Sequence, residues 1–283
     1  MNEFDRWFKL YFEVSCWVYA TAPWIVAPIT LFINAPFGRF SPADSKWMVD
    51  GNTSWMLMEI VAPVFFIATY LYAPFSPTHN PPSLNHPSTL LAALFVIHYV
   101  NRAIISPLRS PGRSKSHIII VIAGIGFNII NAPSSPHSFQ KLQQKLAAKV
   151  AESQTLQMAF ADRKFQVGIA LFVLGFVSNI LHDEILYNIR RNAPTTPDGK
   201  HRYSIPQGYL YNYISYPNYF SEWVEFAGFA LAASPRWEYT PPWMFLVAEM
   251  LVMAPRAHRG HQWYHTKFPD YPTERRAVIP FVF

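Results

Sequence analysis

The sequence predicts an all-α, polytopic membrane protein with about seven transmembrane helices in a single domain, residues 1–283. Two observations support this fold class. Hydrophobic residues make up 51% of the chain and charged residues only 14%, whereas a soluble domain has roughly 25% charged residues. Apolar segments approaching the length of about 20 residues that a helix needs to cross a bilayer recur along the whole chain.

Seven apolar segments are candidate spans, separated by polar and proline-rich connections. They cover about residues 10–33, 54–72, 88–105, 118–130, 165–187, 218–233 and 242–253. Pro23 and Pro28 are expected to kink the first span, since proline removes a backbone hydrogen bond. The fifth span is the clearest, the fourth and seventh are short, and the sixth carries charges.

The distribution of basic residues predicts the orientation. Lys and Arg cluster after the third, fifth and seventh spans, while the loop 73–87 has none. Because basic residues collect on the cytosolic side, we expect a lumenal amino terminus and a cytosolic carboxy terminus in the endoplasmic reticulum membrane. Segment 131–164 disagrees, because it holds five Lys and Arg residues on the lumenal side. The apolar spacing in its middle predicts an amphipathic helix at the membrane interface.

The last segment, 255–283, changes from apolar to basic and aromatic. Its cations and rings favour either a membrane-edge anchor or an ordered surface for an anionic, planar ligand. The chain's net charge of +6 suits anionic lipid or an anionic cofactor and does not require nucleic acid. The cationic and aromatic residues are Arg256, His258, Arg259, His261, His265, Lys267, Arg275, Arg276, Trp263, Tyr264, Phe268 and Tyr271.

Ionisable residues inside spans are functional candidates. Glu59 lies well inside the second span, where a carboxyl group is expected to be partly neutral and able to donate a hydrogen bond to a substrate carbonyl. Tyr99 in the third span can donate to the same kind of oxygen. Arg102 follows on the face of Tyr99. The structural alternatives are a helix–helix hydrogen bond for Glu59, packing for Tyr99 and a membrane-edge anchor for Arg102.

The fifth and sixth spans carry further polar residues. Amide, carboxylate and guanidinium groups along one route fit a ribose hydroxyl, an amide and a phosphate. Ion pairing between helices is the structural alternative. These residues are Asn179, Asp183, Arg190, Asn218, Glu222 and Glu225.

Several other chemistries have no signature. The chain has no HExxH or CxxC motif, so no metal site is expected, and the single cysteine, Cys16, excludes an intramolecular disulfide. The segment Gly124-Ile125-Gly126 lacks the third glycine and the strand–turn–helix context of a dinucleotide fingerprint. Any dinucleotide is therefore expected to bind without a Rossmann domain.

Six elements in chain order resemble the steroid 5-alpha-reductase family. They are Trp55-x-x-x-Glu59; His98-Tyr99 with Arg102 and Pro107-Leu108-Arg109; Asn179, Asp183 and Arg190; Tyr203-x-Ile205-Pro206-Gln207-Gly208; Asn218-Tyr219-Phe220-x-Glu222-x-x-Glu225; and a carboxy-terminal signature of His261-Gln262-Trp263-Tyr264, Lys267-Phe268, Asp270-Tyr271-Pro272 and Arg275 to Phe283. The resemblance extends from about Trp55 to Phe283.

The resemblance implies a membrane enzyme that reduces the C4–C5 double bond of a 3-oxo-Δ4-steroid with NADPH. Glu59 and Tyr99 would polarise the enone carbonyl, with Trp55 beside the substrate. Hydride would go to the beta carbon and a proton to the alpha carbon. The expected partners are a hydrophobic steroid or isoprenoid and the bilayer, with a monomeric protein. The residues implied at the NADPH site are Arg102, Arg109, Asn179, Asp183, Arg190, Tyr203, Asn218, Glu222, His261 and Tyr264.

Two departures from the family pattern and four alternatives qualify the resemblance. The family usually continues with a helical stretch after Ala132, where this chain has Pro133-Ser134-Ser135-Pro136. Many family members have paired histidines where this chain has Gly260 before His261. A polyprenol reductase or an enoyl-CoA reductase would use similar chemistry. A membrane methyltransferase of the isoprenylcysteine type has a similar tail but carries a paired glutamate that is missing here. A non-enzymatic transporter or scaffold is the alternative of a different class.

Overall fold

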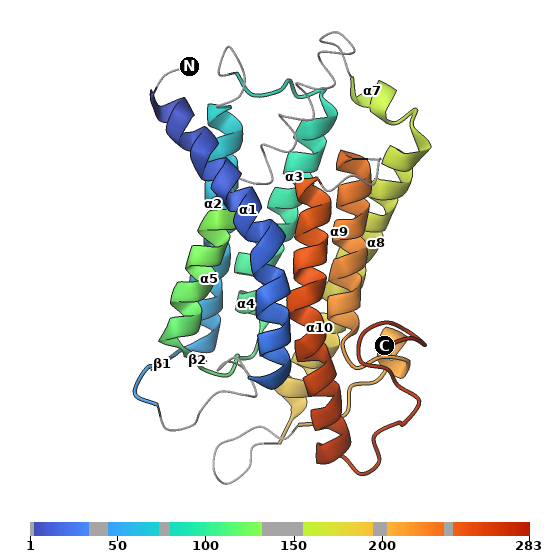
Figure 1. The fold of residues 1–283 in the computed structure, drawn as a ribbon. Coiled ribbons are helices and arrows are strands. Elements are labelled where there is room, and N and C mark those ends of the chain that lie inside the picture. Colours follow the sequence, from blue (N-terminus) through green and yellow to red (C-terminus); the bar gives the residue numbers. More distant parts are fainter. Residues whose placement is uncertain (1–2, 34–44, 74–79, 132–154, 195–202, 235–239) are drawn as a thin grey trace.

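The computed structural model describes residues 3–33, 45–73, 80–131, 155–194, 203–234 and 240–283. Long helices run side by side and alternate in direction, with the two ends of the chain at opposite ends of the bundle (Figure 1). The long helical segments are α1 (Glu3–Phe32), α2 (Gly51–Tyr72), α3 (Pro87–Val100), α5 (Ile118–Asn131), α8 (Arg163–Asn192), α9 (Pro217–Ala233) and α10 (Pro241–Lys267). Each predicted span coincides with one of these helices.

Four helical segments are long and apolar enough to cross a membrane by length and composition, and α5 is a shorter apolar helix. The four are α1, α2, α8 and the continuous segment Pro87–Arg109. The protein is therefore a mostly helical, multi-pass membrane protein. Among the described residues, α9 and α10 do not meet this criterion, so the count of seven spans remains a prediction.

Helix ends follow the local sequence. The side chain of Asp50 caps α2 by accepting a hydrogen bond from Thr53 N at 2.8 Å. Proline occupies the first turn of α3, α9 and α10, where its missing N–H leaves no helical bond unmade. α10 continues well beyond the predicted end at Met253, because nothing between Pro255 and Lys267 breaks the helix. A proline at position 255 is tolerated inside it.

Short elements connect the helices. β1 (Met48–Val49) pairs antiparallel with β2 (Ser116–His117), which holds the start of α2 beside the start of α5. This pairing was not predicted. The other short elements are η2 (Asn101–Ile105), α4 (Ser106–Arg109), α7 (Leu156–Ala159) and η3 (Tyr209–Asn212). The amphipathic helix predicted within 131–164 falls mainly on residues 132–154, outside the described residues.

The backbones of α8 and α9 approach closely at glycines. A β-carbon on Gly168 would lie 2.7 Å from the carbonyl oxygen of Gly228, and one on Gly175 would lie 2.6 Å from that of Ser221. Small residues at a helix interface allow such contact inside a membrane. The hydroxyl groups of Ser178 and Ser221 hydrogen-bond across it at 2.7 Å.

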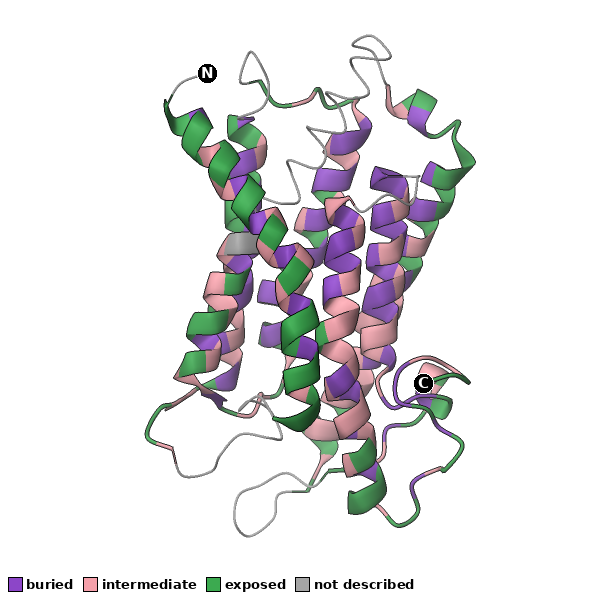
Figure 2. Cartoon of the chain, viewed as in Figure 1, coloured by how far each residue is buried: buried purple, intermediate pink, exposed green. Residues whose placement is uncertain are grey.

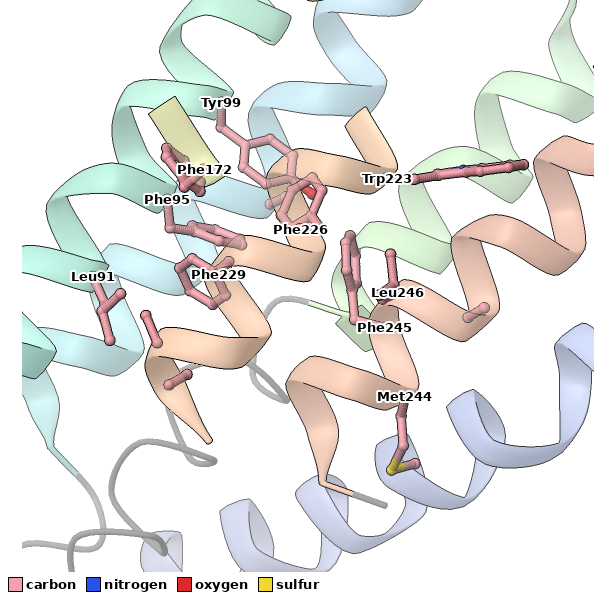
Figure 3. Close-up of a cluster of buried hydrophobic side chains, with 14 of the residues drawn as sticks. Leu91, Phe95, Tyr99, Phe172, Trp223, Phe226, Phe229, Met244, Phe245 and Leu246 are labelled. Atoms are coloured by element: carbon pink, nitrogen blue, oxygen red, sulfur yellow. The ribbon is translucent and has the colours of Figure 1, made fainter. Parts of the chain in front are cut away.

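The core is rich in aromatic rings (Figure 3). Phe66 stacks on Phe95 with centroids 4.2 Å apart, and Phe226 contacts Phe245 at 4.6 Å. Buried residues face the interior, while exposed residues lie on the outer faces of helices such as α1 (Figure 2). Many of those exposed residues are large and apolar; Trp17, for example, is 73% exposed. An apolar outer face suits contact with lipid.

Candidate active site

Arg102 lies at the centre of the polar interior. Its Nε donates to Glu59 Oε2 at 3.0 Å and its Nη1 to Glu222 Oε1 at 2.7 Å. The guanidinium carbon lies 5.0 Å from the ring centroid of Trp55, and Trp55 Nε1 donates to the backbone oxygen of Arg102 at 3.1 Å. Side chains from α2, η2 and α9 thus meet at one cation.

The backbone at Arg102 is a π-helix, η2, inserted between α3 and α4. The N–H of Ser106 donates to the carbonyl of Asn101, five residues earlier. Pro107 follows and lacks an N–H to continue the α-helical pattern. Single π-helical turns are frequent at functional sites, because they re-aim the side chains of a helix.

The contact between Glu59 and Arg102 differs from the sequence expectation. Glu59 was expected to act as a neutral donor, but here its carboxylate accepts a charge-assisted hydrogen bond. Arg102 was expected to contact the cofactor or anchor the helix, and its pairing with Glu59 was not foreseen. The sequence did not show this because the two residues are 43 positions apart.

A pocket of about 440 Å³ opens beside this centre. Four arginines reach it from different elements, and amide and carboxylate groups line it as well. Within it, Asn179 Nδ2 donates to the carbonyl of Asn218 at 3.0 Å, and Asn218 Nδ2 donates to Asp183 Oδ1 at 3.3 Å. The lining residues used below are Trp55, Arg102, Arg113, Asn179, Asp183, Arg190, Tyr203, Asn218, Glu222, Glu225 and Arg256.

Eight of the predicted site residues line this pocket: Trp55, Arg102, Asn179, Asp183, Arg190, Tyr203, Asn218 and Glu222. Glu59 borders it through Arg102. Tyr99 lies deeper, 4% exposed, in the aromatic core. Its ring is 4.6 Å from that of Phe95 and points from α3 toward Phe226 (Figure 3).

Three predicted cofactor residues do not line the pocket. Arg109 pairs with Glu184 at 2.6 Å, on an exposed surface that Arg191 shares. His261 Nδ1 shares a hydrogen bond with the hydroxyl of Ser215 at 2.6 Å. The ring of Tyr264 stacks on that of Tyr271, 5.1 Å away. Each of these three side chains contacts another residue and stabilises the local packing of the chain.

The carboxy-terminal segment folds back on the connection between α8 and α9. Ser215 N donates to the carbonyl of Arg276 at 2.9 Å, beside an isolated bridge. Arg275 is only 2% exposed and donates to the carbonyl of Pro206 at 3.0 Å and to the side chain of Gln207 at 2.8 Å. These contacts explain why this basic and aromatic segment is ordered.

Electrostatics in this segment reflect its burial. Burial raises the pKa of the Tyr271 hydroxyl above its ordinary value, although the hydrogen bond with Ser215 opposes the shift. His261 lies beyond the predicted span 242–253. Burial, followed by the electrostatic interaction with His265, lowers its pKa to about 4. His261 is therefore neutral at pH 7, and its Nδ1 shares a hydrogen bond with the hydroxyl of Ser215.

Gly260 accounts for one of the two departures from the family pattern. A β-carbon at this position would overlap the hydroxyl group of Tyr216. The glycine therefore lets α10 pack against the segment that precedes α9. A larger residue here would displace Tyr216.

Sequence reasoning missed three polar features. Arg113 is one of the basic residues that follow the third span, and its guanidinium lies 4.5 Å from the Trp55 ring centroid. His98 Nδ1 and Glu225 Oε1 pair at 2.8 Å in the core. Glu249 on α10 is the only acid in the predicted span 242–253. The rule that ionisable residues inside spans are functional candidates, which selected Glu59, applies equally to Glu249.

A second pocket, of about 550 Å³, is almost wholly apolar. It lies between α1, α10 and the end of the chain. The indole N–H of Trp223, which lines it, is buried and has no hydrogen-bond partner among the described residues. The described residues contain no group of three or more His, Cys, Asp or Glu residues arranged to hold a metal ion.

Comparison with known proteins places the chain in a family. Residues 114–283 match the family model described as 3-oxo-5-alpha-steroid 4-dehydrogenase. An uncharacterised protein of Schizosaccharomyces pombe is 36% identical over 282 residues, covering 91% of this chain and 94% of that protein. The 3-oxo-5-alpha-steroid 4-dehydrogenase 1 of Rattus norvegicus is 31% identical, covering 88% and 87%.

A plant relative extends the match. The steroid 5-alpha-reductase DET2 of Gossypium hirsutum is 28% identical over 278 residues, covering 96% of each chain. The family model matches more than half of the chain, and the relatives match nearly all of it. The chain therefore belongs to the 3-oxo-5-alpha-steroid 4-dehydrogenase family of NADPH-dependent enone reductases.

Proposed function

We propose that this protein reduces the C4–C5 double bond of 3-oxo-Δ4-steroids with NADPH. The observation that carries the proposal is the cationic pocket beside Arg102, which adjoins Glu59 and, deeper in the bundle, Tyr99. Family membership supports an enone reductase, and the apolar surroundings of Tyr99 suit a steroid. We propose further that the protein is a monomer in the endoplasmic reticulum membrane, with a lumenal amino terminus and a cytosolic carboxy terminus.

The residues of the pocket fit NADPH. Arg113 Nε is buried and lacks a partner, and Arg190 makes no ion pair or hydrogen bond with any described residue, so both can take phosphate oxygens. The chain of Asn179, Asn218 and Asp183 offers donors and acceptors for ribose and amide groups. Arg102 and Glu222 complete the set of residues proposed to hold it. His261, Tyr264 and Arg109 would act indirectly, by holding the surrounding chain.

The proposed catalytic pair is Glu59 and Tyr99. When bound, NADPH supplies a hydride to the beta carbon of the enone. The Tyr99 hydroxyl would donate to the carbonyl oxygen and stabilise the charge that develops there. Glu59 would hold Arg102 in place between the two sites, and its second oxygen would face the substrate beside Trp55. Removing one such donor costs about 3–4 kcal/mol in other oxyanion sites. The aromatic core around Tyr99 would exclude water.

The binding half of the proposal is tested by measuring NADPH affinity in purified protein. Arg190→Ala removes a phosphate contact that has no structural partner and should weaken binding about 10- to 100-fold, equivalent to about 1.5–3 kcal/mol. Arg191→Ala is the matched control, because Arg191 pairs with Glu184 instead. It should leave the affinity unchanged. Equal affinity in the wild type and Arg190→Ala would contradict the assigned pocket.

The catalytic half is tested with membranes, NADPH and testosterone or progesterone. Wild type should consume NADPH and form the 5-alpha product, while Tyr99→Phe and Glu59→Gln should each lose at least tenfold in rate. Binding of NADPH without turnover of any steroid would point to a polyprenol or another enone. Absence of NADPH binding in wild type would refute the reductase and make S-adenosylmethionine the next ligand to test.

A further inference from the structure

Glu249 is a carboxyl group without a partner in the interior of the bundle. It projects from α10, and its Oε2 is buried without a hydrogen bond to any described residue. No ion pair joins it to the described part of the chain. Among the other buried side-chain atoms without a partner in the described residues are the hydroxyl of Tyr19, in a side chain 5% exposed, and Oε2 of Glu225, 0% exposed. Buried polar atoms are normally satisfied, so this set requires an explanation.

The neighbours of Glu249 belong to two environments. It interacts electrostatically with Glu222, Glu225 and Arg102, which line the cationic pocket. It also interacts with Tyr99 and Tyr19. Both tyrosines are buried in the aromatic core. Val252 and Met253, one turn further along α10, line the pocket, so Glu249 is near the pocket and interacts with groups both of the pocket and of the closed region where the enone carbonyl is proposed to lie.

Charge pairing leaves Glu249 unmatched. Arg102 pairs with Glu59 and Glu222, and His98 pairs with Glu225. An unpaired carboxylate in a low-dielectric interior is costly, and such a group is most stable when it carries a proton. The titratable and charged side chains that interact with it are Tyr19, Glu59, Tyr99, Arg102, Glu222 and Glu225, and His98 faces this group through its pair with Glu225.

We propose that Glu249 holds the proton that the reduction consumes and delivers it to the alpha carbon of the substrate. This inference rests on the proposed function. Hydride transfer to the beta carbon leaves an enolate. The O–H bond of Glu249 then breaks, the enolate electron pair forms the new C–H bond, and the carboxylate regains a proton from water that enters through the cationic pocket.

The protonation state can be read without substrate or cofactor. Infrared spectroscopy of the purified protein detects the C=O stretch of a protonated carboxyl group, which moves on exchange into D₂O. We expect this band in the wild type at pH 7 and its loss in Glu249→Gln. Glu274→Gln is the matched control, because Glu274 is exposed and lies outside the predicted spans, and it should keep the band. An identical spectrum in wild type and Glu249→Gln would overturn the proposal.

The delivery of the proton is tested by turnover in D₂O. Wild type should place deuterium on one face of the alpha carbon, as read by NMR of the product. Glu249→Gln should lose at least tenfold in kcat, keep the affinity for NADPH, and place deuterium on both faces. Glu249→Asp should restore the single face. A purely structural role would not change the face of labelling.

The two proposals fail separately. If wild type reduces steroid and Glu249→Gln keeps both kcat and the single face, the proton role of Glu249 is wrong and the reductase stands. If wild type reduces no enone, the proposed function and the catalytic use of this proton both fail. The infrared band then still reports whether Glu249 is protonated.

Discussion

Replacing Arg102 with methionine should destabilise the protein strongly. Methionine fills much of the same volume but leaves Glu59 and Glu222 without a cation. The side chain of Glu222 is 4% exposed and that of Glu59 is 11% exposed. Water therefore cannot replace the lost hydrogen bonds well.

The size of the effect follows from these contacts. Removing one partner of a buried ion pair costs about 3–5 kcal/mol. Arg102 is itself 26% exposed, which keeps the estimate near the middle of that range, at about 4 kcal/mol. An unpaired carboxylate can escape its unfavourable burial by taking up a proton, which costs at most about 4 kcal/mol at pH 7. The loss of stability from two orphaned carboxylates therefore cannot much exceed twice that value. For a large domain, about 2 °C per kcal/mol gives a fall in Tm of about 8 °C.

The assay is thermal unfolding in detergent micelles at a fixed heating rate. The triple variant Arg102→Met, Glu59→Gln, Glu222→Gln removes the orphaned charges and should recover at least half of the lost Tm. Arg191→Met is the control, since the pair of Arg191 with Glu184 is exposed and such pairs contribute about 0–1 kcal/mol. A single variant as stable as wild type, or a triple variant no better than the single one, would refute the reasoning.

Two further predictions concern stability. Gly260→Ala should lower Tm by the equivalent of about 1–3 kcal/mol, because its β-carbon overlaps the hydroxyl of Tyr216. Gly126→Ala should leave Tm unchanged, because there is open space around that position. An equal fall in Tm in both variants would contradict the packing of Gly260 against Tyr216. Asp50→Ala should cost about 1 kcal/mol at pH 7, because it removes the cap of α2. The hydrogen bond from the backbone N–H of Thr53 lowers the pKa of Asp50. The stability that the cap contributes is therefore fully present above the ordinary carboxyl pKa and is lost as the pH falls through the lowered pKa. The Tm difference from wild type should therefore shrink toward pH 3, and a constant difference would show that the charge is irrelevant.

The positions of the long helices could be predicted from the sequence, because hydropathy alone decides where a chain can span a bilayer. Their ends could not. α10 runs to Lys267 because its polar continuation still has good helix formers, and a hydropathy window stops where the apolar residues stop. The π-helix at Asn101–Ile105 was also invisible, since no simple spacing rule marks one.

The residues of the candidate site were predictable, but their contacts were not. A lone ionisable residue in an apolar span is easily seen, and Glu59, Glu222 and Asp183 were found in this way. Which charge meets which depends on how helices distant in sequence pack. The pairing of Arg102 with two glutamates and the stacking of Arg113 on Trp55 therefore needed the structure.

The pairs around Arg102 also bear on the order in which the chain enters the membrane. Glu59 precedes Arg102 by 43 positions and Glu222 follows it by 120. A nascent chain can therefore insert Arg102 with Glu59 already present, which lowers the cost of a charge in lipid. The second carboxylate arrives only when α9 does. Until then the early helices contain an incomplete charge cluster, so the pocket beside Arg102 cannot form before the last helices are in place.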